Sequence, residues 1–228
     1  LQHSIIARAS KPVTIAPLKI DTLPIDRMGL TPFTFSRWLV PWLCDYEGWA
    51  LFIDADMLVM DDIIELMDMA DDRYALMATK NPDPKLAFEW PSVMLWNCGH
   101  EANKVVDPAF VQLKSNNPYK LGWLSGYESA LVGTLPREWN HLVGYDEPRE
   151  DAKLAHYTMG APIFPETEAS EYREPFLEEH KMMNSAAPWN QLMARSKHAA
   201  HLPDGQVLPH YHPDVVAHNQ QQGQTAAE

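Results

Sequence analysis

Short apolar runs alternate with amphipathic stretches along most of the chain. Runs of this length, bounded by turn residues, are typical of strands that are buried on both faces. Strands are therefore predicted at residues 12–20, 49–53, 73–79, 92–98 and 153–158. Apolar residues at helical spacing predict helices at residues 1–9, 31–43 and 61–70, and a mostly helical region at residues 101–131.

Strands that alternate with helices predict an α/β fold, with an open, mostly parallel sheet flanked by helices. After about residue 165 the pattern weakens to one helical stretch, EYREPFLEEHKMMN, and an irregular tail. We expect an α/β domain at residues 1–165 and a C-terminal helix with a loosely ordered tail at residues 166–228. The chain begins at Leu1 inside an amphipathic segment, so we expect the natural N-terminus to lie upstream.

Composition and charge narrow the class of protein. The 228 residues are 46% hydrophobic and 10% aromatic, which is typical of a globular protein. A formal charge of −13 argues against a nucleic-acid backbone as the main partner, because such binding depends on clustered Lys and Arg. No apolar run reaches the roughly 18 residues that a transmembrane helix needs.

Cys44 and Cys98 form no CxxC motif, and no signal peptide is visible. We therefore predict a cytoplasmic protein with reduced, buried thiols.

An acidic pair, Asp54 and Asp56, ends one of the predicted core strands in the stretch ALFIDADMLVMDD. Ligands of parallel sheets collect at the carboxyl ends of strands, and residues i and i+2 of an extended chain point the same way. Two carboxylates in this arrangement suit Mg²⁺ or Mn²⁺. The alternative, that one Asp caps the next turn and the other is solvated, stays open for so short a motif.

A carboxylate pair in an α/β frame fits two enzyme classes, a nucleotide-sugar glycosyltransferase and a phosphotransferase of the haloacid-dehalogenase type. In the second class the first Asp is a nucleophile and the second is an acid or base. That class also needs a later lysine and a further acidic pair at strand ends. The DD pairs at residues 61–62 and 71–72 lie in or beside the helix that follows the motif, which is the wrong place.

Two stretches, FSRWLVPWL and GWALFIDADMLVMDDIIEL, resemble the central segment of the GT-A glycosyltransferase fold. The resemblance is closest to the family-eight-like, glycogenin-related enzymes and their bacterial or phage relatives. Three later stretches match in the same order: PSVMLWNCG, LPREWNHLVG and KLAHYTMGAPIF. The resemblance spans roughly residues 3–165. It implies a metal-dependent transferase that moves a sugar from a nucleotide-diphosphate sugar to a hydroxyl acceptor, with retention of the anomeric configuration.

By the same resemblance, Asp54, Asp56 and His156 bind the divalent metal that holds the donor diphosphate, and Ala55 lies in the donor site. A neutral imidazole beside carboxylates favours Mn²⁺ over Mg²⁺, and a UDP-sugar is the favoured donor. Taken alone, His156 would be a histidine at the edge of the core.

The chain departs from the family in two ways. The family motif HFxGxxKPW contains a lysine, whereas HYTMGAPIF has no lysine and one extra residue before Gly160. We therefore expect the diphosphate to be bound by the metal, by the Gly160 N–H group and by Arg37 or Lys80. The first strand of the fold, which normally contacts the base, is also missing. A sugar-nucleotide-binding protein without turnover is therefore an alternative.

Other residues are candidates for contact with the sugars. Glu128 aligns with an acidic position that would stabilise oxocarbenium character, and Asn97 would bond to sugar hydroxyls. The alternatives are a solvated Glu128, a turn-forming Asn97 and a surface Arg37. Aromatic rings stack on the apolar faces of sugars, so four tryptophans are candidates for ligand contact, with a role in the core as the alternative: Trp90, Trp96, Trp123 and Trp139. His210 and His212 are candidate metal ligands, with a chance pairing in the tail as the alternative.

Overall fold

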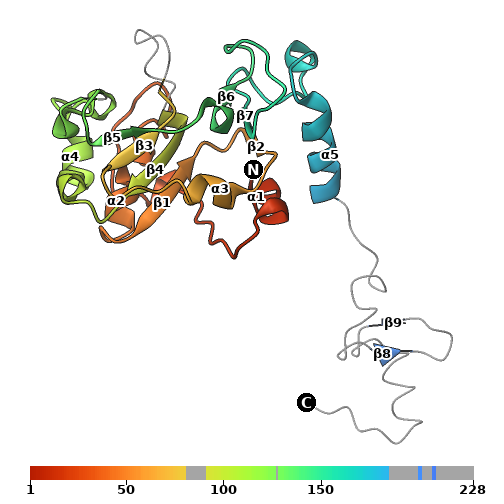
Figure 1. Cartoon of the computed structure of the whole chain (residues 1–228), viewed down its shortest axis with the longest axis horizontal. Coiled ribbons are helices and arrows are strands. Elements are labelled where there is room, and N and C mark those ends of the chain that lie inside the picture. The colour runs from red at the N-terminus through yellow and green to blue at the C-terminus, as the bar shows by residue number, and fades with distance from the viewer. Residues whose placement is uncertain (81–90, 127, 185–199, 202–206, 209–228) are drawn as a thin grey trace, which may run out of the picture. The chain divides into compact units, whose positions relative to one another are not determined.

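The computed structural model describes residues 1–80, 91–126, 128–184, 200–201 and 207–208. The chain forms two compact units, Leu1–His180 and Lys181–Glu228. The first unit contains the predicted α/β domain (Figure 1). In the second unit, β8 (Ala200–His201) pairs antiparallel with β9 (Val207–Leu208).

The first unit is built from short elements. Its strands are β1 (Trp49–Ile53), β2 (Met57–Val59), β3 (Leu76–Ala78), β4 (Val93–Asn97), β5 (Val132–Thr134), β6 (His141–Leu142) and β7 (Leu154–His156). Its α-helices are α1 (Gln2–Arg8), α2 (Val40–Leu43), α3 (Ile63–Met67), α4 (Pro108–Gln112) and α5 (Arg173–Met183), the last of which continues into the second unit. Short 3-10 helices lie at Ile20–Thr22, Ser36–Leu39, Glu101–Val105, Pro118–Lys120, Gly122–Leu124, Arg137–Trp139 and Pro165–Thr167.

The larger sheet has the strand order β1-β4-β3-β5. β4 pairs antiparallel with β1 and with β3, whereas β3 and β5 are parallel. The strands β1, β3 and β5 therefore run in the same direction, and their carboxyl ends meet at one edge. The α/β architecture with open sheets and flanking helices is confirmed, but the sheet is mixed rather than mostly parallel.

A smaller sheet has the order β2-β7-β6. β2 pairs antiparallel with β7, with Met57 opposite His156, and β6 pairs parallel with β7, with Leu142 opposite His156. The chain passes from the larger sheet to the smaller one through residues 54–56, between β1 and β2. The acidic pair thus lies where the two sheets meet.

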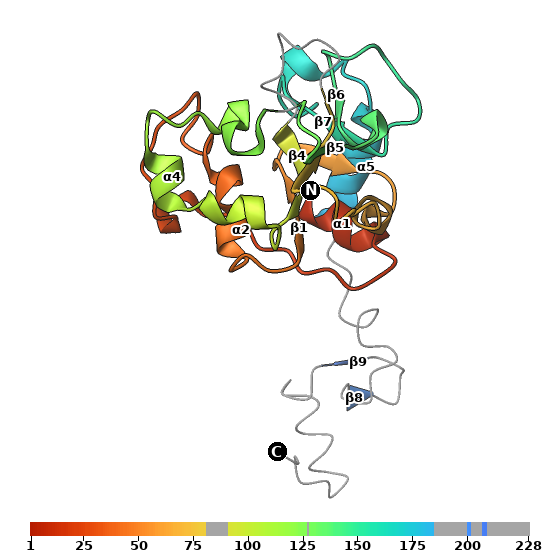
Figure 2. The same cartoon turned by 60° about the vertical axis from the view of Figure 1, so that its left-hand side comes forward.

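Both faces of the larger sheet are covered. Met94 and Trp96 belong to a core cluster with side chains from the segment 35–40, and α2 and α4 lie on this side of the sheet (Figure 2). The alternate residues, Val93 and Leu95, belong to a second cluster that includes residues of the smaller sheet. The first four side chains of β4 are fully buried, which explains why this part of the strand is a continuous apolar run.

Some local predictions are wrong. Residues 12–19 form no regular structure, because Pro12 and Pro17 lack the N–H groups that a strand donates to its neighbour. The helix predicted at 31–43 begins only at Ser36, as a 3-10 turn followed by the short α2, and the region 101–131 contains only short helices. The strands β2, β5 and β6 were not predicted, since strands of two or three residues are too short to show a recognisable pattern of apolar residues.

None of the helices in the described part of the chain combines the length and the apolar character needed to cross a membrane. The loosely ordered tail predicted for the last residues lies largely outside the described residues. The predicted domain boundary at residue 165 stays a prediction.

The core position Leu95 gives a test of the packing between the sheets. Leu95→Ala should lower the free energy of unfolding by about 2–5 kcal/mol, because it opens a cavity in the cluster that both sheets share. Urea unfolding followed by circular dichroism measures this change. Leu30→Ala is the matched control, since Leu30 is 84% exposed and its truncation should change stability by less than about 0.5 kcal/mol. Equal losses in the two variants would contradict the packing described.

Candidate metal centre

Three side chains that are far apart in sequence come together where the sheets meet. One ligand atom from each of Asp54, Asp56 and His156 lies within 4.8 Å of the other two. Metal–ligand bonds of roughly 2.1–2.3 Å place the ligand atoms of an octahedral ion about 3.0–4.6 Å apart. The three side chains therefore fit one divalent ion of the Mn²⁺ or Mg²⁺ type.

The backbone positions each of these residues. The N–H group of Asp54 donates to the carbonyl of Ser92 at 3.0 Å, which extends the pairing of β1 with β4 by one residue. The carbonyl of Asp56 accepts from the N–H of Tyr157 at 3.0 Å, which places Asp56 beside the end of β7. The Nε2 atom of His156 then lies 3.4 Å from Asp56 Oδ1 and is the imidazole atom that faces the acids.

Arg37 is buried behind this group rather than exposed on a helix surface. One of its terminal nitrogens lies 3.1 Å from Asp54 Oδ1, and the other donates to the carbonyl of Pro91 at 2.8 Å. The guanidinium also lies over the ring of Phe52, 5.1 Å from its centroid. In this arrangement the guanidinium of Arg37 faces Asp54 and orients its carboxylate.

Burial and charge move the two carboxyl groups in opposite directions. Burial raises the pKa of Asp54, and the lowering by Arg37 and His156 does not fully offset it. Burial also acts to raise the pKa of Asp56, but the hydrogen bond and the charge of His156 outweigh it, and the pKa is lowered. Because the negative charge of Asp54 remains under-compensated, a further cation at this point is electrostatically favourable.

Three other residues predicted in the donor site follow the carboxyl ends of β1, β3 and β7. Lys80 follows β3 on the side where β1 ends at Asp54, and the segment after Lys80 lies outside the described residues. Ala55 is exposed between the two acids. Gly160 has a φ of +111° and its N–H group donates to the carbonyl of Tyr157 at 2.8 Å. A bond from this N–H group to a diphosphate would require that turn to open.

Asn97 lies at the opposite edge of the sheet, which contradicts its predicted contact with the sugar. In the antiparallel pairing it is opposite Trp49, the first residue of β1, roughly 16 Å from Asp54 at about 3.3 Å per residue. Its amide donates to the carbonyl of Tyr74. The prediction assumed that β4 runs parallel to β1.

Glu128 is exposed in the turn before β5, and no hydrogen bond or ion pair joins it to another described residue. β5 enters the sheet with Val132 beside Leu76, away from the edge that carries Asp54. The predicted role of Glu128 at the anomeric carbon stays a prediction.

The tryptophans are mainly core residues. Trp96 and Trp139 are fully buried, and the half-buried Trp123 packs edge-on against Trp38 and Phe110. The alternative reading of these side chains as core is therefore correct. Trp90, His210 and His212 lie outside the described residues.

Sequence reasoning missed two buried polar residues beside the centre, Ser92 and Asn140. The Asn140 amide nitrogen donates to Ser92 Oγ at 2.9 Å, and the same hydroxyl lies 3.1 Å from Asn140 Oδ1. Both residues lie in the matched stretches PSVMLWNCG and LPREWNHLVG. For Ser92 the available signal was a polar residue at the start of an apolar stretch, whereas Asn140 stands among other polar residues and carries no such signal.

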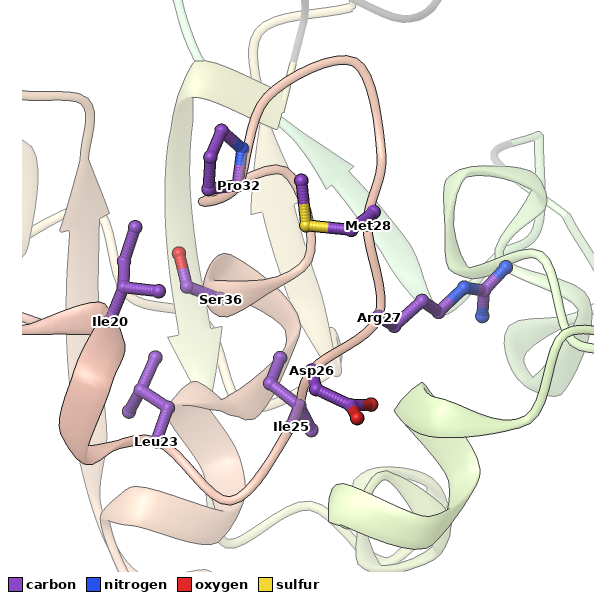
Figure 3. Close-up of a pocket in the computed structure, with 8 residues that line it drawn as sticks. All are labelled: Ile20, Leu23, Ile25, Asp26, Arg27, Met28, Pro32 and Ser36. Atoms are coloured by element: carbon purple, nitrogen blue, oxygen red, sulfur yellow. The ribbon is translucent and has the colours of Figure 1, made fainter.

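A pocket lies beside the segment that carries Arg37, with about 330 Å³ of empty space that includes a part open to solvent. Its wall is mostly apolar, with Ile20, Leu23 and Ile25 on one side (Figure 3). The side chain of Arg27 extends away from the other lining residues, and its guanidinium donates to the carbonyls of residues 111, 113 and 116. The guanidinium of Arg27 is therefore bonded to the backbone of the protein itself.

The pair of Arg37 and Asp54 gives a test of the electrostatics. Arg37→Gln should raise the pKa of Asp54 further, because burial remains while the strongest opposing charge is lost. The free energy of unfolding at neutral pH should fall by about 3–5 kcal/mol, and the loss should shrink as the pH falls through the pKa of Asp54. Carboxyl-detected NMR titration and urea unfolding measure the two effects.

The control for this test is Lys11→Gln, which breaks an exposed ion pair with Asp68. Exposed pairs contribute about 0–1 kcal/mol, so the control should leave both stability and the pKa of Asp54 nearly unchanged. An Asp54 pKa that does not respond to Arg37→Gln would contradict the arrangement.

No family model matches the chain. Among solved structures, the WbbM bifunctional glycosyltransferase superposes with a TM-score of 0.53 at 18% identity, over 75% of this chain and 38% of that one. The galactosyltransferase LgtC, solved with donor and acceptor sugar analogues, gives 0.45 at 16% identity over 74% and 73% of the two chains. GlyE of Streptococcus pneumoniae TIGR4 gives 0.46 at 19% identity over 71% and 45%. The fold is that of the GT-A glycosyltransferases.

A curated relative is much closer in sequence than these structures. Protein CDI of Arabidopsis thaliana is 34% identical over 212 residues, which cover 80% of this chain and 80% of that protein. An identity of this size over this share of both chains reflects common descent of the whole domain. The chain belongs to the family of Protein CDI.

Proposed function

We propose that this protein is a metal-dependent glycosyltransferase that moves a sugar from a nucleotide-diphosphate sugar to a hydroxyl acceptor with retention. The observation that carries the proposal is the convergence of Asp54, Asp56 and His156 at the strand ends of a GT-A fold. Two carboxylates and an imidazole favour Mn²⁺, with Mg²⁺ as the second choice. A UDP-sugar is the proposed donor, and the hexosyl class of sugar and the cytoplasmic location remain predictions.

When bound, the divalent ion supplies the positive charge that offsets the charge growing on the leaving diphosphate. The residues of the chain prepare the site for it. Arg37 orients Asp54 from the buried side, while His156 lowers the pKa of Asp56. Lys80, at the carboxyl end of β3, is the proposed second positive group for the diphosphate, in place of the lysine that HYTMGAPIF lacks.

A second candidate is a protein of the same fold that binds sugar nucleotides without turnover. The bond from the Gly160 N–H group to Tyr157 favours it, because the donor that the family motif would supply is engaged in a turn. For the phosphatase alternative, the further acidic residues that it requires are engaged in other contacts. Of its candidate acids, Asp61 pairs with Lys153, Asp62 caps α3 and Asp71 pairs with Arg73.

Binding of the donor can be tested without knowing the acceptor. A panel of nucleotide sugars is screened by thermal unfolding with Mn²⁺ and with excess chelator. A ligand at a concentration 100 times its dissociation constant stabilises the native state by about 2.7 kcal/mol, so the true donor should raise the melting temperature only when Mn²⁺ is present. Assays of sugar release and transfer on the hits then separate an enzyme from a binding protein.

The variant that tests the centre is Asp56→Asn. We expect it to lower Mn²⁺ affinity at least about 10–100-fold, the loss that follows even from removing a group behind a metal ligand. Mn²⁺-dependent transfer should be abolished, while circular dichroism and the melting temperature of the metal-free protein stay close to wild type. Isothermal titration with Mn²⁺ and the transfer assay provide the measurements.

Asp61→Asn is the matched control, because Asp61 is a neighbouring carboxylate outside the group of ligands. It should retain Mn²⁺ binding and activity. Wild-type activity in Asp56→Asn, or equal losses in both variants, would refute the proposed metal centre.

A further inference from the structure

We propose that the buried pair of Ser92 and Asn140 is a positioning device that sets the distance between Asp54 and His156. The inference rests on the proposed function, since it concerns the metal centre of that reaction. Ser92 acts through its backbone bond to Asp54, and Asn140 acts through the residues that follow it, which pair with the strand that carries His156.

On one side, the pair controls the position of Asp54. Ser92 is 2% exposed, and its carbonyl accepts the backbone N–H of Asp54 at 3.0 Å. Its hydroxyl is bonded to the side chain of Asn140, which is fully buried. A shift of Ser92 therefore moves the backbone of Asp54 directly.

On the other side, the pair controls the position of His156. Asn140 directly precedes β6, where Leu142 lies opposite His156. The next residue, Val143, donates its N–H to the carbonyl of His156 at 2.9 Å. Asn140 is thus two residues before the strand position opposite His156 and three residues before the N–H group that bonds to its carbonyl.

The pair matters because the two sheets are not held together by strand pairing. Among the described residues, no strand of β1-β4-β3-β5 pairs with a strand of β2-β7-β6. The sheets are joined by the chain at residues 54–56 and 135–140, by a bond from the Thr79 hydroxyl to the Pro136 carbonyl at 3.4 Å, and by the shared apolar cluster, whose packing is non-directional. A metal bond, by contrast, tolerates displacements of only about 0.2 Å. A directional bond between the sheets supplies the precision that packing does not.

The chemistry of the pair agrees with this role. Buried polar groups are costly unless they are bonded to each other, and apolar side chains of the same shape would pack without that cost. Ser92 and Asn140 hydrogen-bond to each other at a point between β4 and β6. An apolar contact at this point would not set the position of one sheet relative to the other. The polar pair therefore serves to orient the two sheets relative to one another.

The test uses the affinity for Mn²⁺ in the absence of any nucleotide sugar, measured by electron paramagnetic resonance of the free ion. In Asn140→Ala the dissociation constant should rise about tenfold, the lower end of the loss seen when groups behind metal ligands are removed. Ser92→Ala removes only a hydroxyl and should fold even if Asn140→Ala does not. It should raise the dissociation constant in the same direction.

The matched control is Asn103→Ala. Asn103 is also fully buried and donates to the carbonyls of Ala75 and Asn97, at the edge of the sheet away from the metal centre. Its loss should lower the melting temperature but leave the dissociation constant for Mn²⁺ within about twofold of wild type, because no bond connects it to a ligand.

The outcomes separate the two proposals. If wild type binds Mn²⁺ and the Ser92 and Asn140 variants bind it equally well, or no worse than Asn103→Ala, the positioning role is refuted while the metal centre stands. If wild type does not bind Mn²⁺, the proposed function fails and this inference fails with it. In the double variant the effects should be less than additive, because both substitutions remove the same contact.

Discussion

The passage of the chain from one sheet to the other within residues 54–56 is the constraint on which the site depends. β1 ends at Ile53 in the larger sheet and β2 begins at Met57 in the smaller one. The carboxylates between them must lie at the junction, because no residues remain to carry them elsewhere. The pairing of Met57 with His156 then brings the imidazole to the same place. The candidate metal centre is a consequence of how two sheets join.

Electrostatics at this junction follows from its burial. Desolvation disfavours the charge on Asp54, and Arg37 offsets only part of the effect. A buried ion pair contributes little to stability when compared with apolar packing, so its presence here points to a function for the carboxylate. The same burial explains why Arg37 is enclosed by Phe52 and the Pro91 carbonyl rather than directed to solvent.

Much of the site could be predicted from the sequence because its signals are local. The apolar run before Asp54, the spacing of the two acids and the ordered motifs up to His156 identified all three candidate ligands and the α/β class. The error at Asn97 arises from strand direction. An apolar run of the β4 type carries no information about direction, so Asn97 was assigned to the edge that carries Asp54 when it belongs at the other. Gly160 was read from its motif, but its N–H group is engaged in a turn that no pattern reveals.

The sequence by itself determined where β1 ends and which side chains have the chemistry to bind a metal, since these depend on residue type and short-range spacing. Only the tertiary structure decided which strand ends share an edge, that Arg37 faces Asp54 and that Ser92 and Asn140 join the sheets. These are contacts between residues up to about a hundred positions apart. Their geometry depends on strand direction and register, which arise from packing of the whole domain and not from any local pattern.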